Sequence, residues 1–392
     1  MNNPQSTIRD PQSKIVIAGA GPAGASLAIR LTTLGIETVL IERERFPRHK
    51  LCGEFISPEC LKHFESLGVL ENMLSAGGDR ILETRFFESG GKSVAVPTRW
   101  FGEGDFALSL SRAEMDNRLL DRAKEIGVTV HEATAVTDIE SEDGRVVAVR
   151  TRTANGDIRD IHADLFVDAT GRSRILTKLV EKKQDVAQPL VKPELVGFKA
   201  HLRDVDLARG LCEIYSFQGG YAGLSHVEDG LFNLCFLIKA ATVRSIGSDA
   251  AELVKQVVTR NKRAAVTLRE ATAIGDWLAV SIDSFGTKNT SAATNLFTVG
   301  DAAAFIDPFT GSGMVMAFES AEVLANAITA GSQSSVQIAR EYQAAYREKF
   351  ANRLRVCSML RRTAFMPNVA TAIVTLLGIS TTARRRLAQA TR

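Results

Sequence analysis

A glycine-rich turn near the N-terminus is the pattern that points most directly to chemistry. The chain reads Gly19-x-Gly21-x-x-Gly24 after a short β-branched strand, and Glu42 ends the next apolar run. Such glycines allow a tight turn, close approach of the backbone to a pyrophosphate, and close packing of helix on strand. The free N–H groups of the helix start favour the anion, and Glu42 can accept hydrogen bonds from a ribose 2′-hydroxyl. The pattern predicts an adenine dinucleotide site.

A second chemical pattern lies near the end of the chain. Asp301 follows a predicted strand, and the turn Gly311-Ser312-Gly313 leads into a helix predicted from Met314 to Ile328. An acid at a strand end can bind a polyol hydroxyl, and the positive end of a helix stabilises negative charge. A reduced flavin is negative near its N1 and O2 atoms, so the start of this helix suits a flavin.

Three further residues are candidates for catalysis, and each has a structural alternative. Cys52 could contact a cofactor or substrate, or be a small buried apolar residue. Glu54 could orient a substrate or move a proton, or cap a turn. Tyr221 could contact substrate, or be a strand aromatic on a sheet face. The sequence leaves both interpretations open for each of them.

The composition is that of an ordinary globular protein. The chain has 392 residues, 45% of them hydrophobic and 24% charged, and a net charge of +3, which makes no case for a nucleic-acid partner. The five cysteines show neither metal-ligand spacing nor a disulfide framework, so we expect no metal site and a reducing, cytoplasmic setting. Residues 1–13 are polar, lack the apolar core of a secretory signal, and are predicted to form a disordered lead-in.

The hydrophobic periodicity predicts an α/β fold. A helix is expected over Arg112–Glu125, strands over 128–130, 133–139, 146–153, 158–163 and 164–168, and a hairpin turn at Asn155-Gly156. Asp168 ends the last of these strands and begins the sequence Asp-Ala-Thr-Gly. It could contact a cofactor or close the strand-to-loop turn. Strand-rich blocks interrupt the pattern, so we predict a sheet domain inserted into a discontinuous nucleotide-binding domain. The predicted boundaries are 14–79, 108–185 and 286–335 for the nucleotide-binding domain, 80–107 and 186–285 for the inserted sheet domain, and 336–392 for a C-terminal helical segment.

The segment from Ala364 to Ile379 is the most apolar stretch of the chain. It is short for a membrane span and is interrupted by Pro367. We predict a C-terminal helix docked on the core. The flanking arginines keep open an alternative, peripheral contact of this helix with a membrane surface.

The motifs together resemble a known superfamily. GAGPAG with Glu42, DATGRS at 168–173 and GDAAAFIDPFTGSG at 300–313 occur in the order seen in FAD-dependent enzymes of the aromatic hydroxylase (flavin monooxygenase) superfamily. With KLCGE at 50–54, the chain is more specifically similar to the geranylgeranyl reductase family. The resemblance covers most of residues 14–330 and implies a Rossmann-like FAD-binding domain with an inserted substrate-binding sheet.

The resemblance also implies roles for particular positions. The Gly19–Gly24 turn would line the pyrophosphate, Glu42 would hold the adenosine ribose, and Arg112 would reach the phosphate and ribityl region. Val136 would meet the adenine through its backbone, Asp301 would bind the ribityl or pyrophosphate segment, and backbone N–H groups at 313–314 would face the isoalloxazine. The positions assigned to the cofactor site are Gly19, Gly21, Ala23, Gly24, Glu42, Arg43, Cys52, Gly53, Arg112, Val136, Asp301, Pro308, Gly311, Gly313 and Met314.

Three reactions compete. Hydroxylation of an electron-rich ring needs a dry pocket and a group that favours the phenolate, whereas reduction of a C=C bond needs a proton donor. Halogenation needs a lysine beside a halide site. The tryptophan halogenase motif WxWxIP is absent, Lys92 is predicted at a hairpin tip, and the reductase motif YxWxFP is degraded at 221–226.

We therefore predict an FAD-dependent monooxygenase of a hydrophobic or aromatic metabolite, with NAD(P)H or a partner reductase as electron donor. A geranylgeranyl-reductase-like reductase of an isoprenoid C=C bond is the alternative, and a halogenase or a non-catalytic flavin protein is less favoured. The substrate is expected between the inserted sheet and the flavin, against 52–54 and Pro308-Phe309, because domain interfaces favour pockets. Phe217, Tyr221 and Phe236 are the predicted lining residues from the sheet.

Overall fold

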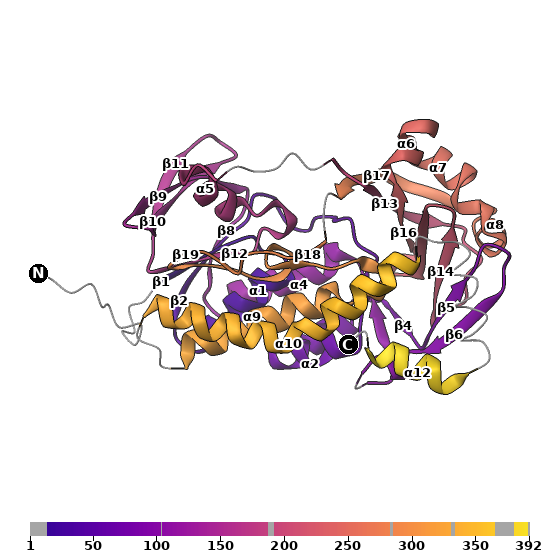
Figure 1. Ribbon diagram of the computed structural model, residues 1–392, viewed down its shortest axis with the longest axis horizontal. Coiled ribbons are helices and arrows are strands. Elements are labelled where there is room, and N and C mark those ends of the chain that lie inside the picture. Colours follow the sequence, from indigo (N-terminus) through magenta and orange to yellow (C-terminus); the bar gives the residue numbers. More distant parts are fainter. Residues whose placement is uncertain are drawn as a thin grey trace, which may run out of the picture.

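Two sheets with their helices lie side by side in the computed structural model, and a long helix, α10 (Ser335–Ala364), runs along the first of them (Figure 1). The structure describes residues 14–102, 104–186, 192–282, 285–330, 334–364 and 380–390. The predicted lead-in over 1–13, and residues 365–379 of the apolar C-terminal stretch, lie outside these described residues.

The first sheet has six strands in the order β19-β20-β12-β1-β2-β8. All neighbours are parallel except β19 with β20, so this is the parallel sheet that the alternating strand and helix pattern predicts. The α/β fold class is confirmed. The strands are β1 (Lys14–Ala18), β2 (Glu37–Ile41), β8 (Thr129–His131), β12 (Leu165–Asp168), β19 (Ser291–Ala293) and β20 (Leu296–Thr298).

Different layers cover the two faces of this sheet (Figure 1). One face carries α1 (Pro22–Thr33), α4 (Arg112–Glu125) and α9 (Gly313–Thr329), with α2 (Glu59–Ser66) and α3 (Leu70–Leu74) beside them. The other carries α5 (Ile175–Lys183) and a three-stranded antiparallel meander, β9 (Thr134–Glu142), β10 (Arg145–Thr153) and β11 (Ile158–His162). Both layers bury the sheet, which explains why β1 and β12 are apolar on both sides.

The second sheet has seven strands in the order β17-β13-β16-β15-β14-β5-β6. Its outer face packs on α6 (Ala240–Ile246), α7 (Ala250–Gln256) and α8 (Lys262–Thr267). The small sheet β3 (Phe55–Ile56), β7 (Ala107–Ser109) and β4 (Asp79–Ile81) lies where the chain passes between the two large ones. The strands of the second sheet are β5 (Glu83–Phe87), β6 (Ser93–Pro97), β13 (Leu195–Arg203), β14 (Leu211–Phe217), β15 (Gly220–His226), β16 (Phe232–Lys239) and β17 (Thr272–Ile282).

Two of the predicted lining residues lie on the other face of the second sheet, so their prediction was wrong. Phe217 and Phe236 belong to the outer core, packed with Leu253 of α7, and so face away from the first domain. Tyr221 points the other way, into a separate cluster with Phe305. Successive side chains of a strand point to opposite faces, so an aromatic strand residue is as well suited to the outer core as to the interface.

The C-terminal helices dock on both domains. Tyr342 of α10 donates a hydrogen bond to the Thr298 carbonyl at 2.7 Å, and Arg353 pairs with buried Glu319 of α9 at 2.6 Å. Helix α12 (Thr381–Ala390) lies on β6, where Arg384 donates to the Ala95 carbonyl at 3.1 Å. None of the helices in the described part of the chain is long and apolar enough to cross a membrane.

Candidate functional site

The glycine turn at 19–24 is held by close backbone contacts. A Cβ at Gly19 would lie 2.4 Å from the Ala169 carbonyl oxygen, and one at Gly24 would lie 1.8 Å from the Gly19 oxygen. Gly21 differs, because a Cβ there would meet only the Arg112 guanidinium, at 3.8 Å. Gly19 and Gly24 are therefore required for packing, whereas Gly21 faces open space at the start of α1, where a phosphate could approach the backbone.

Asp168 closes the turn that carries Ala169. The carboxylate accepts hydrogen bonds from the backbone and hydroxyl of Thr170, at 3.1 and 2.6 Å, and from those of Thr177, both at 2.9 Å. The side chain is fully buried. Of the two interpretations that the sequence left open, the structure favours the structural one.

Glu42 is also held by the backbone. Its carboxylate accepts from the amides of Ala20 at 2.9 Å and Glu44 at 3.0 Å, and the Thr134 amide donates to its carbonyl at 2.9 Å. The acid is thus fixed beside the glycine turn. Val136 lies two residues beyond Thr134 on β9, paired with Thr151 of β10.

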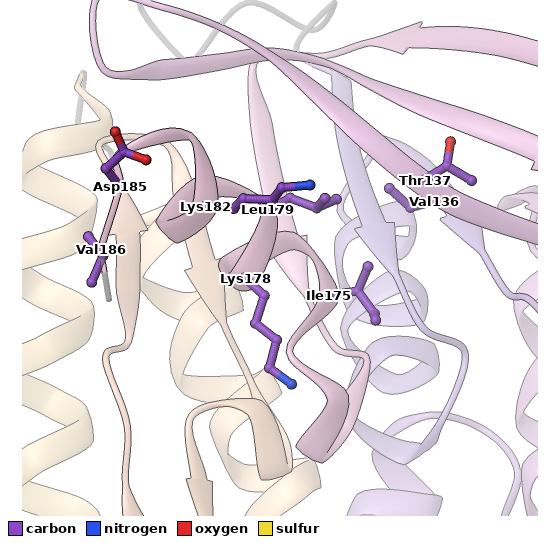
Figure 2. Close-up of a pocket in the computed structure, with 8 residues that line it drawn as sticks. All are labelled: Val136, Thr137, Ile175, Lys178, Leu179, Lys182, Asp185 and Val186. Carbon is purple, nitrogen blue, oxygen red and sulfur yellow. The ribbon is translucent and has the colours of Figure 1, made fainter. Parts of the chain in front are cut away.

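An open cavity of about 650 Å³ lies between β9 and α5. Figure 2 shows Val136 and Thr137 on one side of it and four residues of α5, among them Lys178 and Lys182, on the other. Val136 thus reaches this groove with its side chain. The adenine contact expected of its backbone remains a prediction.

Arg112 is positioned by a partner that was not predicted from the sequence. Asp116, one helical turn along α4 and fully buried, accepts from Nε at 2.8 Å and from Nη2 at 2.6 Å, and also pairs with Arg48 at 2.8 Å. Burial alone would lower the pKa of Arg112, but Asp116 and, to a lesser degree, Cys52 raise it. The spacing of four residues was the available signal.

Asp301 approaches the same region as Arg112 from a different part of the chain. A Cβ at Gly300 would come within 2.9 Å of the Ala23 side chain, so this glycine lets the Asp301 turn approach α1. Burial raises the pKa of the Asp301 carboxyl to about 6, against the opposing charges of Arg172 and Arg112. The glycine turn, Arg112 and Asp301 therefore converge.

Asp307 joins the two domains at the turn before α9. Its carboxylate accepts from the Tyr221 hydroxyl at 2.7 Å and from the Phe309 amide at 2.9 Å. The Tyr221 and Phe309 rings meet edge to face at 5.1 Å. Burial first, and then Asp307, hold the pKa of Tyr221 well above its ordinary value, so this phenol is a neutral donor. Leu195, Leu237, Ile282 and Phe305 complete an apolar cluster around it.

Glu54 lies at the centre of a buried polar cluster. One carboxylate oxygen accepts from Lys199 Nζ and, at 2.8 Å, from the Arg112 amide; the other lies 2.8 Å from His201 Nε2. Burial alone would raise the pKa of Glu54, but His201 and Lys199 outweigh it and lower that pKa. Lys199 and His201 were not predicted from the sequence. A lysine and a histidine two positions apart in the strand VGFKAHLR were the available signal.

The neighbouring Cys52-Gly53 segment borders the same region. Cys52 is half-buried, its sulfur accepts from the Glu54 amide at 3.4 Å, and its carbonyl accepts from Asn233 at 3.1 Å. Gly53 is exposed, and a Cβ there would meet nothing within 4 Å. Cys52 and Glu54 thus lie at the domain interface with Arg112, whereas Tyr221 approaches from the Asp307 side.

Other predicted positions lie at the margins of this region. Arg43 is exposed and pairs with Glu44 at 3.2 Å, and Pro308 is exposed on the turn before α9. Gly311 adopts a φ of 64°, Gly313 begins α9, and Met314 is buried behind it. Their cofactor contacts remain predictions.

The chain matches the family model described as "FAD binding domain" over residues 12–353, so it belongs to this family. The glycine turn, the space at Gly21, the oriented guanidinium of Arg112 and the acid at 301 fit a dinucleotide of this kind. The fit rests on positions that lie far apart in the sequence.

The similar proteins have several activities. A tryptophan 2-halogenase of Chondromyces crocatus is 25% identical over 353 residues, which cover 86% of this chain and 66% of that protein. A menaquinone reductase of Mycolicibacterium smegmatis is 27% identical, covering 82% and 77%. The solved chondrochloren halogenase of a myxobacterium superposes with a TM-score of 0.76 at 25% identity, over 88% of this chain and 81% of that one. The chain spans at most about two-thirds of the length of several halogenase relatives.

Removing the Glu42 carboxylate should weaken FAD binding. We expect Glu42→Ala to raise the dissociation constant about 10- to 100-fold, because a hydrogen bond to a charged group contributes about 1.5–3 kcal/mol. Fluorescence titration of FAD-depleted protein measures this. Glu37→Ala, at the exposed start of the same strand, is the control and should bind as the unaltered protein does. Equal affinity of the two variants would contradict the role of Glu42.

Asp301 should make the stability of FAD-depleted protein depend on pH. Its folded pKa of about 6 lies above the unfolded value of about 3.9, so its contribution is fully present below about pH 4 and is lost as pH rises through 6. Urea unfolding of the unaltered protein and of Asp301→Asn between pH 4 and 7 tests this. As pH rises, the unfolding free energy of the unaltered protein should fall relative to that of Asp301→Asn. A constant difference would disprove the raised pKa.

Proposed function

We propose that this FAD-dependent oxidoreductase is a monooxygenase that hydroxylates a hydrophobic or aromatic small molecule. Bound FAD would carry electrons from the donor and supply the reaction with O₂. The protein's own residues must bind the substrate, exclude water and hold protons. The observation that carries the proposal is the apolar aromatic cluster around Tyr221, packed on the turn that leads into α9.

This cluster supports a dry site. Phe305 stacks on Phe285 at 4.9 Å, Phe309 meets Phe86 at 5.7 Å, and Tyr221 lies between the sheet and the turn. Water exclusion protects reactive oxygenating species from side reactions and strengthens every polar contact inside. The neutral Tyr221 hydroxyl holds Asp307, which in turn caps the 3-10 turn at Pro308–Thr310.

We place the substrate between the Cys52-Gly53 segment and the Tyr221 cluster. The open surroundings of Gly53 and the half-buried Cys52 support this position. Both large domains contribute to it, as is usual for small-molecule sites. NAD(P)H is our proposed electron donor, with a partner reductase as the alternative, because the sequence carries a single dinucleotide fingerprint.

Reduction of a quinone or isoprenoid C=C bond is the second candidate. It is favoured by the menaquinone reductase, a relative whose own length the match covers to 77%. A lipophilic substrate would also suit the proposed peripheral membrane contact, for which the exposed Arg385 and Arg386 of α12 are available.

Halogenation is named for several relatives, but neither Lys92 nor Lys199 favours it here. Lys92 is exposed at the β5–β6 turn, where its amide donates to Glu88. Lys199 is buried and paired with the Glu54 carboxylate, which would repel a halide. We therefore rank halogenation third and include it as an outcome of the assay.

One assay separates the three reactions. The FAD-loaded enzyme is incubated with NADH or NADPH, with bromide, and with a panel of phenols, menaquinones and prenylated compounds, under ¹⁸O₂ and under anaerobic conditions. We expect substrate-dependent NAD(P)H oxidation under oxygen and a product that carries one ¹⁸O atom by mass spectrometry. Anaerobic formation of a product two hydrogens heavier would establish the reductase, and a brominated product would establish the halogenase.

Substitution of Tyr221 should lower turnover but leave the FAD content of the protein unchanged. Tyr221→Phe removes the hydrogen bond to Asp307 but keeps the ring packing, so we expect normal FAD content and about a tenfold loss of kcat/KM. Tyr215→Phe is the matched control, because that buried hydroxyl bonds to Glu213 on the opposite face of the same sheet at 2.6 Å. Unchanged turnover in Tyr221→Phe would place the substrate elsewhere.

A further inference from the structure

We propose that Lys199 is a positioning residue: through its buried pair with Glu54 it holds the 51–54 segment and the start of α4 against the inserted sheet, and thereby fixes Arg112 and Cys52 at the FAD site. The proposal depends on FAD binding, which family membership supports, and not on the reaction proposed above. A failure of this proposal is therefore distinguishable from a failure of the proposed reaction.

The 51–54 segment lies across the inner face of the second sheet. Strands β13 and β16 pair Gly197 with Leu237, Lys199 with Cys235, and His201 with Asn233. Leu51 fills the space over the first of these pairs, since a Cβ at Gly197 would lie 3.0 Å from its side chain. The Cys52 carbonyl bonds to Asn233 of the third. The segment thus follows the face pair by pair.

The ion pair between Glu54 and Lys199 holds this segment on the sheet. Its side chain is 0% exposed and that of Lys199 is 2% exposed, so neither ion has water to compensate it. Glu54 also adopts a φ of 53°, in the left-handed region that is uncommon for residues other than glycine. A buried carboxylate in such a conformation persists only where the surrounding donors hold it.

The same carboxylate reaches the cofactor side. The oxygen that pairs with Lys199 also accepts the amide of Arg112, the first residue of α4. The guanidinium of Arg112 lies beside Gly21 and interacts with Cys52. Lys199 is therefore linked to the proposed phosphate-binding residue through a single carboxylate, although it has no hydrogen bond or ion pair to the glycine turn among the described residues.

An ion pair to a buried carboxylate on the opposite face of the sheet provides a matched control. Arg263 pairs with Glu213 at 3.0 Å, and the Glu213 side chain is only 2% exposed. This pair lies in the layer beneath α8 and has no hydrogen bond or ion pair to 51–54 among the described residues. Lys199→Met and Arg263→Met each remove a cation from a buried carboxylate in the same sheet, but only the first does so beside the FAD-binding domain.

The test compares both variants by three measurements: urea unfolding, FAD titration, and the rate of Cys52 alkylation by iodoacetamide in the FAD-loaded protein, read by peptide mass spectrometry. Both variants should lose stability, because each removes the lysine or arginine that pairs with a buried carboxylate. We expect only Lys199→Met to weaken FAD binding, by about tenfold, and to accelerate alkylation of Cys52. Lys199→Arg, which keeps the charge, should restore both properties.

A Lys199→Met protein that is less stable but binds FAD and protects Cys52 as the unaltered protein does would overturn the proposal. Should that variant not fold, Lys199→Met/Glu54→Gln removes the uncompensated charge and provides the second measurement. We expect the double variant to regain stability but not FAD affinity. Recovery of both would make the pair a structural anchor without a positioning role.

Discussion

The whole site depends on the close approach of three stretches of backbone that are far apart in the sequence. The Gly19 turn touches the Ala169 carbonyl, the α1 helix touches the Gly19 oxygen at Gly24, and the Asp301 turn touches α1 at Gly300. A side chain at any of these three glycines would separate the contacting layers, because each Cβ would lie closer than 3.0 Å to a neighbouring atom. The residues predicted to bind the cofactor converge only because these contacts are possible.

Close packing of the first domain does not by itself position the second. The inserted sheet has its own core beneath α6–α8, and the polar contacts that join its inner face to the first domain include two buried carboxylates, each held in a different way. Tyr221 with Asp307 is a neutral donor on a carboxylate, surrounded by aromatic rings. Glu54 with Lys199 is an ion pair, and His201 lies at hydrogen-bonding distance from the same carboxylate. Such directional contacts fix an orientation, which non-directional apolar burial does not.

Local patterns were sufficient to predict what depends on local chemistry. The helix at 112–125, the parallel sheet and the discontinuous insertion follow from periodicity, turns and motif order, and the structure has all three. The direction of strand side chains could not be inferred in the same way: Phe217 and Phe236 face the outer core, although they alternate with residues of the interface. Which face of a strand meets another domain depends on contacts that are distant in the sequence.

Long-range pairing also explains why Lys199 and His201 were not predicted, although Glu54 was. A single acid after a cysteine and a glycine can serve as a cap or a catalyst, and only its partners decide between these roles. Those partners lie 145 and 147 residues away in the chain. A lysine within an apolar strand is costly to bury unless it is paired. A lysine at position 199 therefore indicates that its strand faces a carboxylate, and Glu54 of the first domain provides that carboxylate.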